Sequence, residues 1–226
     1  MVRIATFALS LATAIAASLA LTSTPALALS PAQEEFRVAV QRVPDLAKGE
    51  ELFGTCAACH SHDGSGIADG SVPAIAGQHF PVIVKQLTDF RHDRRWDVRM
   101  EHFVDRHHLA GPSEVADVAG YLSRLAPQPS ARVGDGSSLG AGTSVYFRLC
   151  SRCHGSSGIG DAARLVPRLA GQHYAYLVRQ IHDTADGRRP GMAVDHVRLV
   201  RGLSVEQING VADYLSRMRP AAAARK

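Results

Sequence analysis

Apolar side chains recur at helical spacing near the end of each half of the chain. Two sets of four residues follow the i, i+3, i+4, i+7 pattern of a helix that buries one face: Val115, Val118, Ala119 and Leu122, and Ile208, Val211, Ala212 and Leu215. The pattern predicts helices near 113–125 and 204–217, with Ser113 and Ser204 as N-caps. Further helices are expected from about 45 and about 141 into two Cys-x-x-Cys motifs, and near 81–91 and 175–184. Strand-like alternation is scarce, so the predicted fold class is all-α.

The longest apolar stretch, Ile4 to Leu21, lies at the start of the chain behind a basic Arg3. The following Ala26-Leu27-Ala28 fits the small-x-small rule for signal cleavage. We therefore expect residues 1–28 to be a signal peptide that directs the chain to the periplasm. An uncleaved anchor is the alternative, because the stretch is nearly long enough to span a bilayer.

The chain repeats itself with a shift of 94 residues. Cys56-Ala-Ala-Cys59-His60 aligns with Cys150-Ser-Arg-Cys153-His154, and the segment 73–79, Pro-Ala-Ile-Ala-Gly-Gln-His, aligns with 167–173. Near the end of each copy, 118–124 aligns with 211–217 at a shift of 93. A repeat over this length predicts two copies of one domain.

A Pro-, Gly- and Ser-rich stretch separates the two copies, and such a composition is typical of a linker. We expect an N-terminal domain at 29–127, a linker at 128–140, a C-terminal domain at 141–220 and a tail at 221–226. A domain of this size with short helices buries only a modest apolar core.

The two halves carry opposite charge. Residues 29–128 hold 10 basic and 14 acidic side chains (net −4), whereas 129–226 hold 14 and 7 (net +7). This asymmetry favours docking to different protein partners at the two ends. No nucleic-acid-binding module is recognisable despite the pI of 9.1, so a nucleic-acid partner is not expected.

Cys-x-x-Cys-His is the attachment signature of c-type haem. Two cysteines one helical turn apart can each form a thioether with the porphyrin, and the adjacent histidine then faces the iron. A thioredoxin-like dithiol would need a βαβ context, and zinc would need further ligands in each copy. The two motifs use every cysteine of the chain: Cys56, Cys59, Cys150 and Cys153.

On these motifs, the Pro-x-Ile/Leu-Ala-Gly-Gln-His segment and the closing Ala-x-Tyr-Leu helix, the chain resembles the class I cytochromes c, and specifically the dihaem cytochrome c4 family. The resemblance covers nearly the whole chain after the signal. It implies two tandem cytochrome c domains and two covalently bound haem c groups, with His60 and His154 as proximal iron ligands. It also implies that the carbonyls of Pro73 and Pro167 accept hydrogen bonds from these histidines.

The resemblance further implies a methionine as the distal ligand, placed before the last helix of each copy. Met100 and Met192 occupy that stretch. They lie 92 residues apart, whereas His102 and His196 match the repeat shift of 94. Coordination by His102 and His196 therefore remains open as the alternative. Arg94 and Arg188 are candidates to pair with haem propionates.

Six-coordinate haems predict an electron carrier rather than an enzyme. The resemblance implies a quinol-oxidising complex or a dehydrogenase as donor and a terminal oxidase as acceptor, with membrane contact only through partners or an uncleaved anchor. Two alternatives stay open. One is an electron-accepting subunit of a flavocytochrome or alcohol dehydrogenase complex. The other is a dihaem enzyme with an open iron site, such as a peroxidase or a thiosulfate dehydrogenase.

Overall fold

The computed structural model describes residues 28–220. Residues 1–27 and 221–226 lie outside this range, and with them almost all of the predicted signal peptide and the whole predicted tail. None of the helices within 28–220 combines the length and the apolar character needed to span a membrane.

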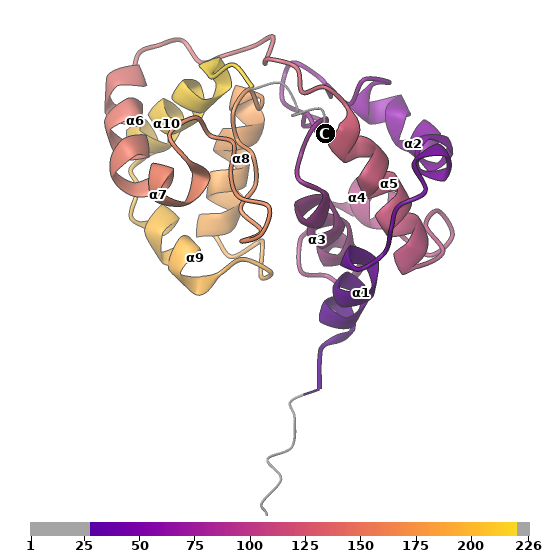
Figure 1. Ribbon diagram of the computed structural model, residues 1–226. Helices are drawn as coiled ribbons and strands as arrows, with labels where there is room; N and C mark the ends of the chain where they lie inside the picture. Colours follow the sequence, from indigo (N-terminus) through magenta and orange to yellow (C-terminus); the bar gives the residue numbers. More distant parts are fainter. Residues whose placement is uncertain (1–27, 221–226) are drawn as a thin grey trace, which may run out of the picture.

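Two helical domains lie side by side (Figure 1). The N-terminal domain is built from α1 (Pro31–Val40), α2 (Leu46–His60), α3 (Phe80–Arg91), α4 (Val98–Phe103) and α5 (Pro112–Arg124). The C-terminal domain is built from α6 (Leu139–Val145), the π-helical turn η1 (Tyr146–Cys150), α7 (Ser151–His154), α8 (Tyr174–Ala185), α9 (Val194–Arg201) and α10 (Val205–Arg217). Within 28–220 no strand forms beyond one isolated bridge between Asp161 and Val166, so the all-α prediction is confirmed.

The predicted helix starts are confirmed at one N-cap and wrong at the other. Ser204 caps α10 in a capping box with Gln207. In the first copy Gly111 is the N-cap, and Ser113 lies inside α5. Pro112 explains the difference, because its fixed φ and missing N–H suit the first helical position.

A glycine lets the helical segment that leads into the Cys motif of each domain cross the last helix closely. A Cβ atom on Gly49 of α2 would lie 2.1 Å from the carbonyl oxygen of Asp117 in α5. In the second domain, a Cβ on Gly142 of α6 would lie 1.8 Å from the backbone of Gly210 in α10. The two crossings are equivalent in the repeat, because Gly142 lies 93 residues after Gly49 and Gly210 lies 93 residues after Asp117.

The π-helical turn η1 absorbs one extra residue in the second domain. The helix crossings repeat with a shift of 93, whereas the Cys-x-x-Cys-His motifs repeat with a shift of 94. The additional residue between Tyr146 and Cys150 widens the helix locally, as a π-bulge does. Tyr146 keeps its place against Tyr214, with ring centroids 5.3 Å apart, and the motif still ends its helix as in the first copy.

The helix α1 is fastened to α3 by a buried ionic cluster. Glu35 pairs with Arg91 and, at 2.7 Å, with His92. The Arg91 side chain also donates hydrogen bonds of 2.7 Å to the carbonyl oxygens of Val104 and Leu109. This cluster ties α1, α3 and the segment 104–109 of the N-terminal domain together.

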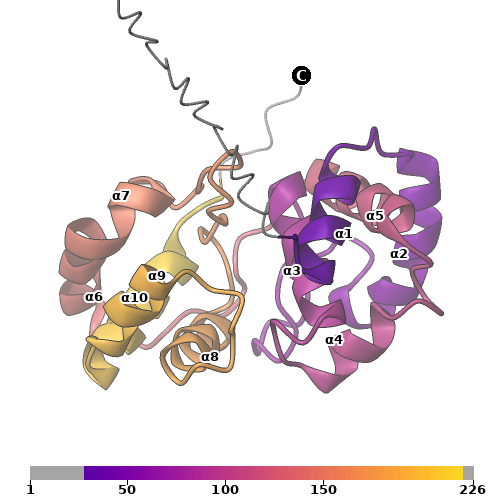
Figure 2. The same cartoon turned by 90° about the horizontal axis from the view of Figure 1, so that it is seen from below.

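The two domains meet through a pair of equivalent glutamines. Gln78 donates from Nε2 to the Arg168 carbonyl (3.0 Å) and accepts from the Arg168 N–H (2.9 Å). Gln172 repeats both bonds with Ala74, at 2.7 and 3.0 Å. Because 74 corresponds to 168 and 78 to 172, these reciprocal bonds have approximate twofold symmetry. Figure 2 shows α3 of the first domain and α8 of the second lying toward the boundary between the domains.

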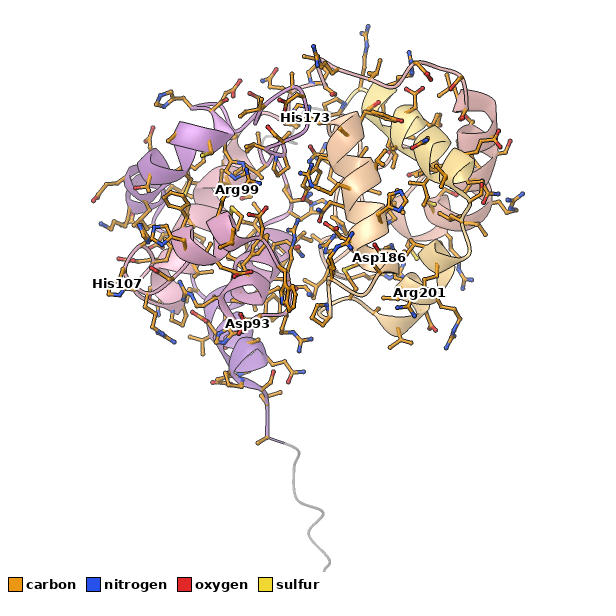
Figure 3. All side chains as sticks on the ribbon, turned by 180° about the vertical axis from the view of Figure 1, so that it is seen from behind. Asp93, Arg99, His107, His173, Asp186 and Arg201 are labelled. Atoms are coloured by element: carbon orange, nitrogen blue, oxygen red, sulfur yellow. The ribbon has the colours of Figure 1, made fainter. Side chains whose placement is uncertain are left out.

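The histidines that follow these glutamines extend the same interface. His79 donates from Nε2 to the Ile159 carbonyl (2.7 Å), and His173 donates to the equivalent carbonyl of Ser65 (2.8 Å). Figure 3 shows His173 at the boundary of the two domains, whereas His107 lies at the outer edge of the N-terminal domain. The repeated Gly-Gln-His corner is therefore part of the contact between the domains.

Replacing both Gln78 and Gln172 with alanine is expected to uncouple the domains. The change removes four hydrogen bonds between the domains, each worth about 0.5–1.5 kcal/mol net. Scanning calorimetry should then resolve two unfolding transitions in place of a more cooperative one. Gln128→Ala is the control, because that exposed side chain bonds only to the nearby Ala126 carbonyl. An unchanged transition in the double variant would show that the glutamines do not couple the domains.

The linker is anchored to the C-terminal domain over part of its length. The N–H of Gly136 donates to Oδ2 of the buried Asp213 (2.9 Å), and Arg217 donates to the Gly134 carbonyl (2.6 Å). Asp213 and Arg217 are themselves paired at 2.7 Å. Gly134 of this stretch thus permits a close approach to α10, because a Cβ there would lie 2.5 Å from Cγ of Asp213.

Candidate haem sites

Each Cys-x-x-Cys-His motif lies at the C-terminal end of the first long helical segment of its domain. Cys59 and Cys153 are exposed, Cys56 and Cys150 are half-buried, and all four are free thiols. Burial raises the pKa of Cys56, and it raises the pKa of Cys150 to about 11. A redox dithiol needs the opposite shift and usually lies at a helix N-terminus. The thioredoxin-like alternative therefore has no support in the structure.

The two motif histidines are buried and held by a proline. His60 and His154 are 6% and 8% exposed. Their Nδ1 atoms lie 3.0 Å from the Pro73 carbonyl and 3.1 Å from the Pro167 carbonyl. A carbonyl oxygen only accepts, so Nδ1 carries the proton and Nε2 keeps its lone pair for a metal.

The chain reverses directly after each of these histidines. Ser61 has φ 65° and ψ 155°, and the equivalent Gly155 has φ 77° and ψ 159°. This region of backbone conformation is comfortable only for glycine, so Ser61 carries strain beside the site. The carbonyls of His60 and His154 accept hydrogen bonds from the N–H groups of Gly66 (2.8 Å) and Gly160 (2.9 Å). These bonds close the turn after each histidine, and the chain then returns so that the proline carbonyl reaches the histidine ring.

Met100, the expected distal ligand of the first site, is partly buried in the N-terminal domain. It is the third residue of α4 and packs against the apolar cluster that also contacts Cys56. His102 lies two residues further along, and its side chain is 64% exposed. Its ring packs against Phe103 and His108 instead, with centroids 5.1 and 4.8 Å apart. The structure therefore brings Met100, and not His102, to the interior of the first domain.

On the distal side of the second site a histidine faces the motif histidine. The rings of His196 and His154 have centroids 6.4 Å apart and planes inclined at 61°. The Nδ1 atom of His196 is buried and has no hydrogen-bond partner among the described residues. Burial lowers the pKa of His154 to about 4 and that of His196 in the same direction, so both rings are neutral at neutral pH. Met192 is half-buried and precedes the first residue of α9 by two positions.

No cluster of three or more His, Cys, Asp or Glu side chains within 28–220 is placed to hold a metal by itself. Zinc bound only by the protein thus finds no site in this range. One histidine per motif, with two free thiols beside it, fits an iron that is held by a covalently attached porphyrin.

The comparisons with known proteins decide the family. The cytochrome c family model matches residues 46–126 and 140–219. The chain is 32% identical over 196 residues to cytochrome c4 of Thiocapsa roseopersicina, with 79% of this chain and 95% of that protein covered. The chain belongs to the cytochrome c family and is a dihaem member of the cytochrome c4 type. It is accordingly an electron-transfer protein that carries two covalently bound haem c groups.

Solved structures show the same fold. Reduced recombinant cytochrome c4 from Pseudomonas stutzeri superposes with a TM-score of 0.69 and 24% identity, covering 78% of this chain and all of that one. The chain is also similar to two proteins of thiosulfate oxidation. A thiosulfate dehydrogenase from Marichromatium purpuratum has a TM-score of 0.70 and 29% identity over 80% of this cytochrome, which spans 42% of that protein. A thiosulfate dehydrogenase electron acceptor from Thiomonas intermedia is 37% identical over 71 residues, 31% of this chain and 32% of its own length.

A cluster of guanidinium groups lies between the domains of this cytochrome. Arg95 donates to Gln86 (2.7 Å) in its own domain and to Gln180 (2.8 Å) and Tyr176 (2.6 Å) in the other. Arg189, its equivalent, donates to Gln86 at 2.8 Å. The Nε atom of Arg189 is buried without a hydrogen-bond partner among the described residues, and burial lowers the pKa of this side chain to about 10.

Arg94 and Arg188, the arginines expected to pair with propionates, form ion pairs with acidic side chains of their own domains. Arg94 pairs with Asp89 at 3.4 Å, and Arg188 pairs with Asp183 and Asp186 at 2.8 and 2.9 Å. The next residue in each copy, Arg95 or Arg189, is the one turned toward the interface. The signal for this was present in the sequence, because 95 and 189 also differ by 94 and Gln86 and Gln180 repeat with them.

Proposed function

We propose that this dihaem cytochrome carries single electrons in the periplasm between a respiratory donor and an acceptor such as a terminal oxidase. The observation that supports the proposal best is the buried histidine in each domain whose Nδ1 is fixed by a proline carbonyl. A proximal ligand held in this way keeps its position when the iron changes charge, which suits electron transfer.

The proposed ligand set follows from the positions of the side chains. Cys56 and Cys59 would bind the first haem and Cys150 and Cys153 the second, through thioethers. His60 and Met100 would be the axial ligands of the first iron, and His154 would be the proximal ligand of the second. For the second distal position the sequence offers Met192 and His196.

The interface arginines are proposed to bind the haem propionates. A guanidinium that is buried between two domains requires a counter-charge, and a carboxylate matches its geometry. Arg95 and Arg189 are linked through Gln86, so their positions are fixed relative to each other. They would hold the propionate edges of the two haems at the domain boundary and keep water from that region.

The proposed partners rest on the opposite net charges of the two halves and on the similarity to electron-transfer proteins. A quinol-oxidising complex or a dehydrogenase would reduce the cytochrome, and a terminal oxidase would oxidise it. The acidic first half and the basic second half favour docking of these partners at opposite ends.

The second candidate function is that of an electron-accepting subunit for a dehydrogenase. It is favoured by the similarity to the thiosulfate dehydrogenase and to the thiosulfate dehydrogenase electron acceptor. In such a complex the chain would receive electrons from a catalytic partner and would not bind thiosulfate itself.

A turnover assay tests the proposal. We expect reduced protein to deliver two electrons per chain to ferricyanide and to be oxidised by membranes that contain a terminal oxidase, in a reaction that cyanide inhibits. Mixed alone with thiosulfate, or in its reduced form with hydrogen peroxide, the protein should show no catalytic turnover. Turnover of either substrate by the chain alone would contradict the carrier function. Haem reduction by thiosulfate only when a catalytic dehydrogenase is added would select the second candidate.

A further inference from the structure

We propose that the two haems have different axial ligands, with Met100 on the first iron and His196, in place of Met192, on the second. The proposal deepens the proposed function, since it concerns the same sites and rests on haem being bound in both domains. It departs from both pairs that the sequence leaves open, Met100 with Met192 on the family resemblance and His102 with His196 on the repeat shift.

The distance between the two histidine rings fits one iron between them. Imidazole nitrogens bind transition metals at about 2 Å, and the ring centre lies roughly 1 Å behind the nitrogen, so two axial imidazoles have centroids about 6 Å apart. The rings of His154 and His196 are 6.4 Å apart. Axial imidazoles are free to differ in rotation about their common axis, so the 61° between the ring planes is compatible with this arrangement.

A second observation separates an iron ligand from an ordinary ring contact. Edge-to-face aromatic contacts also span such distances, but a buried imidazole in a contact of that kind needs partners for its nitrogens. The buried Nδ1 atom of His196 has none among the described residues. Within the described part of the chain, the ring thus has a buried nitrogen without a hydrogen-bond partner beside the proximal histidine, and such a nitrogen is available to a metal.

The lengths of two loops explain why a histidine takes the place of a methionine. Six residues, 92–97, separate α3 from α4, whereas eight residues, 186–193, separate α8 from α9. The helix after the loop therefore starts two residues later in the second copy than the repeat shift predicts. As a result Met100 and His196 are both the third residue of their helix, while His102 is the fifth residue of α4 and Met192 lies before α9.

Spectroscopy of the oxidised holoprotein tests the assignment. Methionine-ligated ferric haem c has a red charge-transfer band that bis-histidine haem lacks. We expect wild-type protein with two haems per chain to show this band at the intensity of one haem, and EPR to show two different low-spin species. Met192→Leu should leave the band and both EPR signals unchanged. Met100→Leu should abolish the band.

Substitution of His196 gives the positive test. His196→Ala should convert one haem of two to high spin, and added imidazole should restore the low-spin signal. His196→Met should raise the red band toward the intensity of two haems. The matched control is His102→Ala, which should change neither spectrum because that ring is turned to solvent. A wild-type band of two-haem intensity that halves in Met192→Leu would overturn the assignment. Should His196→Ala fail to fold, the wild-type and Met192→Leu spectra still show whether Met192 is a ligand of the second iron. A haem content below two per chain would instead contradict the proposed function.

Discussion

Replacing Cys150 and Cys153 together with alanine is expected to remove the second haem and to unfold the C-terminal domain. The two thiols are the proposed attachment points, and the apolar cluster of this domain contains only six buried residues: Val145, Tyr146, Leu177, Val211, Ala212 and Leu215. A core of this size depends on the haem for much of its buried apolar surface. The haem content should fall from two to one per chain, measured by the pyridine haemochrome spectrum and by mass.

Arg152→Ala is the matched control for this change. Arg152 lies between the two cysteines and is exposed, so the variant should keep both haems. The equivalent double change at Cys56 and Cys59 should leave the second haem in place. Retention of two covalently bound haems in the Cys150/Cys153 double variant would show that the attachment site is wrong.

Gly142→Ala is expected to lower the free energy of unfolding by about 1–3 kcal/mol or more, as overpacking does in a tight core. The new methyl group would lie 1.8 Å from the backbone of Gly210, and a backbone neighbour cannot move aside as a flexible side chain can. The helices α6 and α10 would have to separate, and α10 carries much of the C-terminal core. Equilibrium denaturation of the holoprotein, followed by far-UV circular dichroism, measures the effect.

Gly140→Ala provides the comparison within the same helix. Apart from its chain neighbours and the backbone of its own helix, no atom of the described residues lies within 4 Å of a Cβ at this position, so the added methyl group meets no obstacle. Alanine is also the better helix former, by up to about 1 kcal/mol. The Gly140 variant should therefore be as stable as the wild type or more stable. Equal stability of the Gly142 and Gly140 variants would contradict the close crossing of the two helices.

The long helices could be predicted from the sequence because their apolar faces repeat at helical spacing. The helices α5 and α10 begin and end within two residues of the predicted bounds. The helices α1, α4 and α9 were missed. Of these, α4 and α9 are short, and their starts are set by loop length rather than by a periodic pattern. A sequence signal for α1 did exist, since Ser30-Pro31 followed by Gln33 is a capping-box start.

The site residues, like the helices, could be predicted where the signal is local in the sequence and could not where the fold sets their position. The motif cysteines and histidines are local in sequence, and the proline carbonyls lie a fixed thirteen residues on, so the resemblance was enough to predict these contacts. The role of the Gly-Gln-His corner was not predictable locally, because Gln78 bonds to a residue 90 positions away. The position of His196 was hidden because the repeat shift aligns it with His102, whereas the helix start pairs it with Met100.

EPR of the oxidised holoprotein with and without cyanide shows whether both domains hold six-coordinate haem, as the proposed role in electron transfer alone requires. We expect two low-spin signals that integrate to two spins per chain and do not change when cyanide is added. A high-spin signal, or a new low-spin signal with cyanide, would reveal an open or easily displaced iron position and would rule out a role in electron transfer alone.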